Sequence, residues 1–378
     1  MIKDKTFWED ILMSETIKTI KIAPAVFAVN HDYQIMMYTD DQCLMWVKVG
    51  DKTYYDEDNG ILRSCTKVHR VIVPQAELDA AKSYTVCLRY IINRKPYFPE
   101  IEPVQEFTYE FRPVESGKTV RAYHIADAHN WAEGPIAAAK TYGDIDFLIL
   151  NGDIPDHSGT VEKCVTIYEL AAAVTGGNIP VVFARGNHDL RGLMAEKLSE
   201  HTPSDNGKTY FTFRLGGIWG IALDCGEDKE DDHPEYGGTL CCHVFRQREA
   251  EFMRNLAARA NEEYLAEGVT HRIVVCHNPF TLHHPDPFNI ESELFDEWTR
   301  ILSDEIKPDA LISGHMHTMH IIRPGDEEDK RGQKFPVVIA SAKNGQEYFA
   351  GGGFAFDEEG IQVTFTDNKG EVIREERL

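Results

Sequence analysis

The chain has 378 residues, of which 42% are hydrophobic, and its 39 Lys and Arg against 62 Asp and Glu give a formal charge of −23. At about 150 residues per domain, this length predicts two domains. A surface this acidic repels phosphate backbones at long range, so we expect no broad nucleic-acid surface. No apolar run approaches the roughly 18 residues of a membrane span, and the first ten residues contain no signal-peptide core, so we expect neither membrane association nor secretion.

Cysteine and histidine are distributed differently along the chain. The eight cysteines form no CxxC pair, which is typical of reduced, mostly buried thiols and predicts a cytoplasmic location. Of the 16 histidines, only His31 and His69 precede residue 119. A concentration of histidine in one part of a chain is a reason to look there for a metal site.

The segment from about residue 20 to residue 112 has the pattern of an all-β unit. Short β-prone runs are separated by turn residues, and these runs cover residues 33–38, 43–49, 69–73, 84–92 and 107–111. This spacing predicts a small β-sandwich that forms an N-terminal domain over residues 1–118 and ends in a linker. We expect it to pack against the remainder of the chain, because it contains no evident site chemistry.

After residue 118 the pattern changes to strand, loop and helix. Apolar strands are predicted at 120–126, 147–150, 181–184, 218–223, 272–276, 310–313, 335–341, 354–356 and 361–366. Apolar stripes at helical spacing lie at Phe252, Leu256, Ala260 and Tyr264 and at Leu294, Trp298, Ile301 and Leu302. The alternation predicts a second domain over residues 119–378, an α/β sandwich with mixed sheets.

Five of these strands are followed directly by His, Asp or Asn. The segments are Asp127-Ala128-His129, Asn151-Gly152-Asp153, Gly186-Asn187-His188-Asp189, His277-Asn278 and Gly314-His315-Met316-His317. Loops after strand carboxyl ends are where α/β sheets usually hold ligands. Each segment alone is weak evidence, but five in one chain predict a shared site.

These ligand types suit Mn²⁺, Fe²⁺/Fe³⁺ or Zn²⁺, and seven ligands are too many for one tetrahedral ion. We therefore expect two metal ions. The first would be held by Asp127, His129 and His317, the second by Asn187, His277 and His315, with Asp153 bridging them. Two ions about 3.5–4 Å apart clamp an anionic oxygen substrate and lower the pKa of a bridging water.

The same motifs, in this order, resemble the signature of the calcineurin-like metallophosphoesterase superfamily. The resemblance covers residues 119–378 and implies a four-layer α/β/β/α sandwich whose dinuclear centre hydrolyses a small phosphate mono- or diester. It further implies in-line attack by a hydroxide that bridges the metals. The β unit in front is similar in placement to the fibronectin-III-like domain of purple acid phosphatases.

The resemblance also implies a role for His188, which would sit beside the metals without binding them and pair with Asp156. In such a dyad the carboxylate orients the imidazole, which stabilises phosphoryl charge or protonates the leaving oxygen. The tyrosine of purple acid phosphatases is absent at Asp156, and His157 stands where the Ser/Thr phosphatases have an arginine. Substrate contacts must come from elsewhere, and the candidates near the motif loops are Asn130, Arg185, His283 and His284.

Two points stay open. The acidic segment 224–232 is expected to be a solvated loop, although its place after a strand would also suit a lid over the site. A catalytically silent metal-binding scaffold or partner-binding protein, or a hydrolase of another bond, would share this fold. Metal analysis with a panel of mono- and diesters separates these alternatives.

Overall fold

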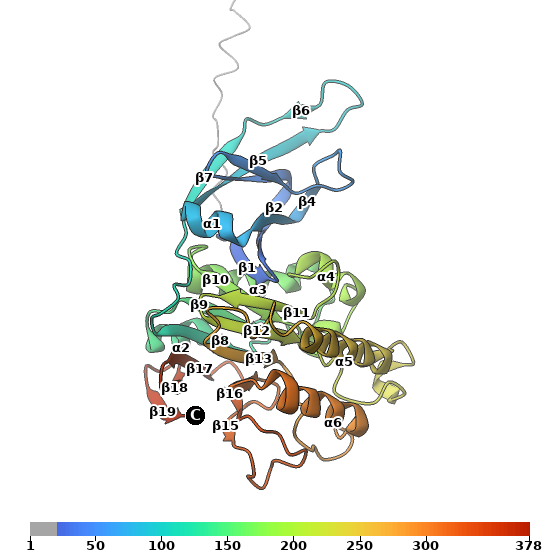
Figure 1. Ribbon diagram of the computed structural model, residues 1–378. Coiled ribbons are helices and arrows are strands. Elements are labelled where there is room, and N and C mark those ends of the chain that lie inside the picture. The colour runs from blue at the N-terminus through green and yellow to red at the C-terminus, as the bar shows by residue number, and fades with distance from the viewer. Residues whose placement is uncertain (1–20) are drawn as a thin grey trace, which may run out of the picture.

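The computed structural model describes residues 21–378, so the first 20 residues of the predicted N-terminal domain, where the signal-peptide expectation falls, lie outside the described part. Figure 1 shows the N-terminal strands stacked on a larger α/β body. The N-terminal elements are β1 (Ala25–Val29), β2 (Asp32–Val49), β3 (Lys52–Tyr55), β4 (Cys65–Pro74), α1 (Gln75–Ala81), β5 (Ser83–Asn93), β6 (Glu100–Ile101) and β7 (Gln105–Glu110).

The N-terminal part is almost entirely β-structure, as the sequence predicts. Its strand β2 is continuous where two strands were predicted, and the exposed residues 40–42 interrupt the pairing with β4 without ending the strand. The short helix α1, which the pattern did not predict, follows β4 directly.

Strand β1 joins the N-terminal part to the α/β body. On one side it is antiparallel to β2, and on the other it runs parallel to β10 (Pro180–Ala184), with Phe27 opposite Val181. One hydrophobic core contains buried residues of both parts, among them Met45, Val86 and Phe213. The domain boundary at residue 118 stays a prediction, and the sheet and the core both continue across it.

The α/β body consists of two sheets face to face. The first contains β1, β10, β9 (Phe147–Asn151) and β8 (Val120–Ile125), all parallel, followed by the antiparallel β17 (Tyr348–Asp357), β18 (Gly360–Asp367) and β19 (Val372–Arg377). The second contains β11 (Phe211–Leu215), β12 (Ile218–Leu223), β13 (His271–Cys276), β14 (Ala310–Ser313), β16 (Val337–Asn344) and β15 (Thr318–Ile322). Strand β17 pairs with β16 and with β8, and so links the two sheets.

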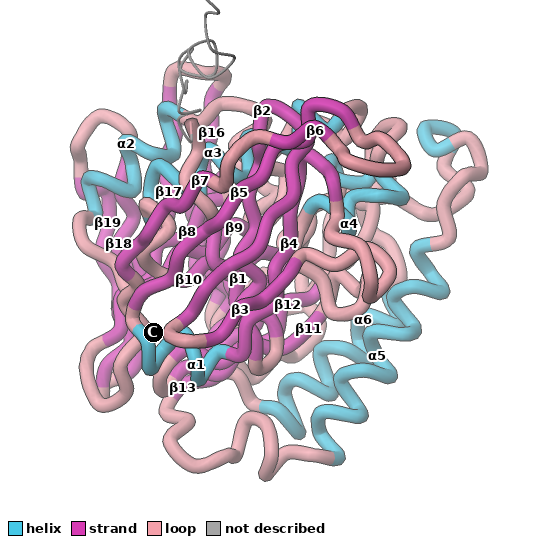
Figure 2. The backbone as a smooth tube through the Cα atoms, turned by 90° about the horizontal axis from the view of Figure 1, so that it is seen from above, coloured by secondary structure: helices cyan, strands magenta, loops and turns pink. Residues whose placement is uncertain are grey.

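Helices cover the outer face of each sheet, on opposite sides of the strands (Figure 2). Helices α2 (Glu133–Tyr142) and α3 (Val161–Thr175) pack on the first sheet, and α5 (Cys242–Ala258) and α6 (Ser292–Ile301) on the second. Along β9, Ile149 points into the core between the sheets while Leu148 and Leu150 point toward the helices, which is the period of two expected of a strand buried on both faces. The predicted four-layer α/β/β/α fold is confirmed.

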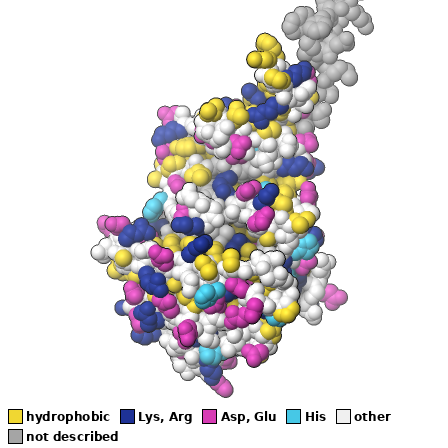
Figure 3. Space-filling model, turned by 90° about the vertical axis from the view of Figure 1, so that its right-hand side faces the viewer, with side chains coloured by type: hydrophobic (Ala, Val, Ile, Leu, Met, Phe, Trp, Pro, Cys, Tyr) yellow, Lys and Arg dark blue, Asp and Glu magenta, His cyan; other side chains and the backbone are white. Residues whose placement is uncertain are grey.

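Both predicted apolar stripes fall on helices, but each stripe extends beyond the end of its helix. Helix α5 ends at Ala258, and Tyr264 lies in the turns that follow, packed against Trp219. A four-residue helix, α4 (Leu198–His201), lies in the connection between the two sheets. No helix in residues 21–378 is long and apolar enough to cross a membrane. On the face drawn in Figure 3, acidic and basic side chains are interspersed.

Candidate metal centre

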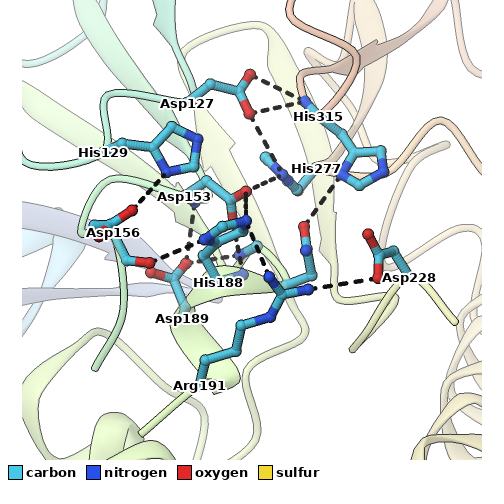
Figure 4. A network of polar contacts seen from close by, with 12 residues as sticks. Asp127, His129, Asp153, Asp156, His188, Asp189, Arg191, Asp228, His277 and His315 are labelled. Carbon is cyan, nitrogen blue, oxygen red and sulfur yellow. Dashed lines mark hydrogen bonds and ion pairs between the residues drawn. The ribbon is translucent and has the colours of Figure 1, made fainter. Parts of the chain in front are cut away.

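The predicted ligands come from loops at the carboxyl ends of parallel strands. Strands β8, β9 and β10 are parallel in the first sheet, and β13 and β14 are parallel in the second. Because parallel strands end at the same sheet edge, their following loops meet there. Figure 4 shows side chains from these loops pointing toward one another.

One cluster contains Asp127, His129 and His317, whose ligand atoms all lie within 4.8 Å of one another. Nε2 of His317 lies 3.4 Å from a carboxylate oxygen of Asp127 and 3.3 Å from Nε2 of His129. The Asp127 side chain is fully buried, whereas His317 is partly exposed. This is the set that was predicted for the first metal ion.

A second cluster contains Asp153, His277 and His315, again with ligand atoms within 4.8 Å. Nε2 of His277 lies 3.2 Å from Asp153, and the side-chain oxygen of Asn187 lies 3.1 Å from Nδ1 of His315. Asp153 also groups with His129 and so stands between the clusters. The structure thus brings all seven predicted ligands together.

Two of the imidazoles are already in the protonation state that binds a metal ion. Burial lowers the pKa of both His129 and His315 to about 4, so both imidazoles are neutral at pH 7 and can bind a metal. Burial would likewise lower the pKa of His277, but Asp153 and Asp127 raise it to about 10. Its buried Nε2 has no hydrogen-bond partner, although it faces the two carboxylates. A metal ion in this place would displace the proton of that nitrogen and neutralise both carboxylates.

The backbone around the site is strained. Five of the predicted ligands have positive φ angles, namely Asp127 (56°), His129 (47°), Asp153 (53°), His315 (69°) and His317 (50°). Such a conformation costs about 1–3 kcal/mol per residue and is concentrated at functional sites. Two motif glycines are required by lack of space and not by backbone conformation. A Cβ on Gly186 would lie 2.3 Å from Asp153 Oδ1, and one on Gly314 would lie 2.9 Å from Asp127 Oδ2.

Supporting residues that the sequence reasoning did not single out hold the ligands in place. The main-chain oxygen of Asn151 accepts a hydrogen bond from Nδ1 of His277 at 2.7 Å, which directs Nε2 into the site. Asp189 accepts the N–H groups of Gly186 at 2.7 Å and of Asp153 at 3.3 Å. Burial, together with Asp153, raises the pKa of Asp189 to about 7. The sequence could have identified Asp189 as a supporting residue from its position in the same motif as Asn187.

The contact between His188 and Asp156 differs from the predicted dyad. Nδ1 of His188 lies 2.9 Å from the main-chain oxygen of Asp156. The Asp156 carboxylate instead lies 3.7 Å from Nδ1 of His129 (Figure 4). The main chain of Asp156 therefore orients His188, while its carboxylate faces His129 from beyond hydrogen-bond distance.

The acidic segment 224–232 is not the solvated loop that was expected. Glu227, Asp228 and Lys229 are all buried, and Arg191 binds both oxygens of Glu227 at 2.9 Å. Lys229 lies 2.9 Å from Asp228, and the Tyr236 hydroxyl donates to both carboxylates. Buried charges need such partners, and these partners could not be read from the spacing because Arg191 is 36 residues from Glu227.

Of the predicted substrate contacts, Arg185 is engaged elsewhere. Its Nε lies 2.6 Å from the buried carboxylate of Asp224. His283 is exposed, and burial lowers the pKa of the half-buried His284. Asn130 follows the first motif and accepts a hydrogen bond from Thr166 at 3.5 Å. Two basic residues that the sequence reasoning missed, Arg191 and Lys343, interact with the motif loops directly.

The two face-to-face sheets and the paired clusters at their edge define the metallophosphoesterase fold. The chain belongs to the calcineurin-like phosphoesterase family, whose match covers residues 120–319. Members of this family are generally phosphohydrolases and typically bind two divalent metal ions. A search of curated proteins finds no match.

Solved structures share the fold. Purple acid phosphatase PPD1 from seeds of yellow lupin (Lupinus luteus) is 12% identical, with a TM-score of 0.57 over 94% of this chain and 73% of that one. The structure of PhoD is 10% identical, with a TM-score of 0.50 over 92% of this chain and 84% of that one. Because these matches cover 94% and 92% of this chain, both extend over the N-terminal strands as well as the α/β body. The match to the family model covers residues 120–319 only.

Proposed function

We propose that this protein is a dinuclear-metal-dependent phosphoesterase that hydrolyses a small phosphate mono- or diester. The observation that carries the proposal is the pair of ligand clusters on either side of Asp153. Asp127, His129 and His317 would hold one ion, and Asn187, His277 and His315 the other, with Asp153 shared. The mixture of carboxylate, imidazole and amide donors suits Mn²⁺, iron or Zn²⁺.

Two such ions would act as Lewis acids on the phosphate and would make a water nucleophilic at neutral pH. The protein supplies a fixed geometry around them. The main chain of Asn151 directs His277, and the Asp156 carboxylate faces the nitrogen of His129 that points away from His317. The contact with Asn151 restricts the rotation of His277 and selects its tautomer, whereas the Asp156 carboxylate lies beyond hydrogen-bond distance of His129.

His188 lies beside the shared carboxylate, with Nε2 4.0 Å from Asp153. We propose that His188 and Arg191 act together on the charge that builds on the phosphoryl group. The guanidinium lies 3.2 Å from Nε2 of His188 and supplies the positive charge, and the main chain of Asp156, rather than its carboxylate, holds the imidazole. Asn130, His283 and His284 remain proposed substrate contacts. Arg185 remains one as well, although its Nε already faces Asp224.

The experiment compares the wild type with Asp153→Asn, with Mn²⁺ supplied to both. Bound metal is measured by mass spectrometry, and turnover is measured on chromogenic mono- and diesters. We expect the variant to lose metal and turnover together, because it removes a carboxylate that groups with His129 on one side and with His277 and His315 on the other. The matched control is Asp144→Asn, an exposed carboxylate in the loop before β9.

Full turnover of Asp153→Asn would overturn the metal assignment. A metal-loaded wild type that hydrolyses none of the esters would overturn the enzymatic proposal and favour a metal-binding scaffold.

A further inference from the structure

The basic side chains near the metal centre differ in how they are neutralised. Arg185 pairs with Asp224, Arg191 with Glu227, and Lys229 with Asp228. Within residues 21–378, Lys343 forms no ion pair, and its hydrogen-bond partner is a main-chain oxygen. Lys343 is thus a basic group at the site that none of the described carboxylates contacts directly.

Lys343 lies at the end of β16, and its side chain is half-buried. Its Nζ donates to the main-chain oxygen of Ala128 at 3.1 Å, between two ligands of the first cluster. Burial lowers its pKa, and its electrostatic neighbours are Asp127, Asp156 and Asp153. Its charge in turn lowers the pKa of His129. These contacts place the ammonium group beside the first metal position.

The charge balance there changes when metal is held. Two divalent ions bring four positive charges, whereas Asp127 and Asp153 bring two negative ones. The ligand carboxylates are then neutralised, and Lys343 adds to a positive surplus. A half-buried ammonium without a close carboxylate is costly, and a bound anion would relieve that cost.

The acidic segment near His315 does not cancel this charge. Glu227 and Asp228 of the acidic segment are held by Arg191, Lys229 and Tyr236. Glu235 also contacts Arg191 and Lys229, so three carboxylates share two cations. Most of the negative charge of the cluster is thus balanced, and it repels a phosphate less than the composition of the segment suggests. The side of the site at Lys343 therefore attracts an anion more strongly than the side at the acidic segment.

We propose that Lys343 binds a non-bridging oxygen of the substrate phosphate and makes the site prefer phosphomonoesters over phosphodiesters. The inference rests on the proposed function. A monoester phosphate carries close to two negative charges at neutral pH, whereas a diester carries one. An added fixed positive charge therefore favours the monoester.

The test measures kcat/KM of the Mn²⁺-loaded protein on p-nitrophenyl phosphate and on bis(p-nitrophenyl) phosphate. For Lys343→Met we expect a loss of about 10- to 100-fold on the monoester, the size of a charge-assisted hydrogen bond, and a clearly smaller loss on the diester. Lys343→Arg should keep most of the preference. Lys140→Met, which removes an exposed charge from α2, is the matched control and should match the wild type.

A second measurement does not depend on turnover. Inorganic phosphate is titrated calorimetrically into the wild type and Lys343→Met at equal metal content, and we expect weaker binding to the variant by a similar factor. Equal phosphate affinity, or equal losses on both esters, would overturn the role of Lys343. A wild type that is inactive on both esters would instead overturn the proposed function, and the phosphate titration would still test Lys343.

Discussion

Nη1 of Arg191 lies 3.2 Å from Nε2 of His188. Nδ1 of the same imidazole faces a main-chain oxygen of Asp156 at 2.9 Å, and an oxygen of this kind can only accept a hydrogen bond. Nδ1 therefore carries the proton, and Nε2 accepts a hydrogen bond from the guanidinium. Because Arg191 also binds Glu227, it connects the motif histidine to the acidic segment.

This relationship makes Arg191 important for stability as well as for activity. Arg191→Met would leave the buried Glu227 carboxylate without its main partner, which costs about 3 kcal/mol of unfolding free energy. We also expect a lower kcat, because His188 loses the group that fixes its Nε2. Chemical denaturation and steady-state kinetics measure the two effects.

An exposed pair provides the comparison for Arg191. Arg254 contacts Glu297 on the surface, so Arg254→Met should cost less than about 1 kcal/mol and leave kcat unchanged. Equal stability losses in the two variants would show that the buried cluster contributes no more than a surface pair.

His188→Ala tests the proposed role of the imidazole separately from metal binding. His188 is grouped with His129 and Asp153 but stands outside the two proposed ligand sets. We expect unchanged metal content and a fall in turnover of about 10²- to 10⁴-fold. Metal analysis and initial rates decide the point, and a variant that has lost its metal would make His188 a ligand instead.

The buried carboxyl of Glu249 predicts a pH-dependent stability. Burial, reinforced by Asp224, raises its pKa well above the usual range, so the folded protein keeps a proton that the unfolded chain releases above about pH 4.3. The stability that this group contributes is fully present below the unfolded pKa and is lost as pH rises toward the folded one. Glu249→Gln removes this dependence.

We therefore expect the unfolding free energy of Glu249→Gln to rise relative to wild type between pH 5 and 7, by up to about 1.4 kcal/mol per pH unit. Urea unfolding at several pH values measures the difference. Glu251→Gln, an exposed neighbour on α5, should track the wild type throughout. A pH-independent difference for Glu249→Gln would contradict the buried, protonated state.

The ligand set could be predicted because it depends on short-range patterns. Apolar runs identify strands, and parallel strands place their following loops at one edge, so Asp127 and His315 meet although 188 residues separate them. The supporting contacts followed no such pattern. Whether Asp156 would offer His188 its carboxylate or its main chain depends on side-chain rotation and loop conformation.

Interactions between distant segments explain the other differences. The acidic segment 224–232 is composed like a solvated loop, and its burial depends on Arg191 from another motif and on Arg246 of α5, which donates to the main-chain oxygens of Cys225 and Glu227. Strand β1 is not among the predicted runs, and nothing in its sequence indicates its partner β10. The cytoplasmic location inferred from the cysteines stays a prediction.

The pairing of β1 with β10 has a consequence for how the protein can be divided. A fragment that begins at residue 119 would expose the backbone N–H and C=O groups along β10, together with apolar side chains such as Phe213 that the N-terminal strands help to cover. An uncovered edge of this kind pairs readily with other chains. The N-terminal strands thus protect the α/β body against self-association.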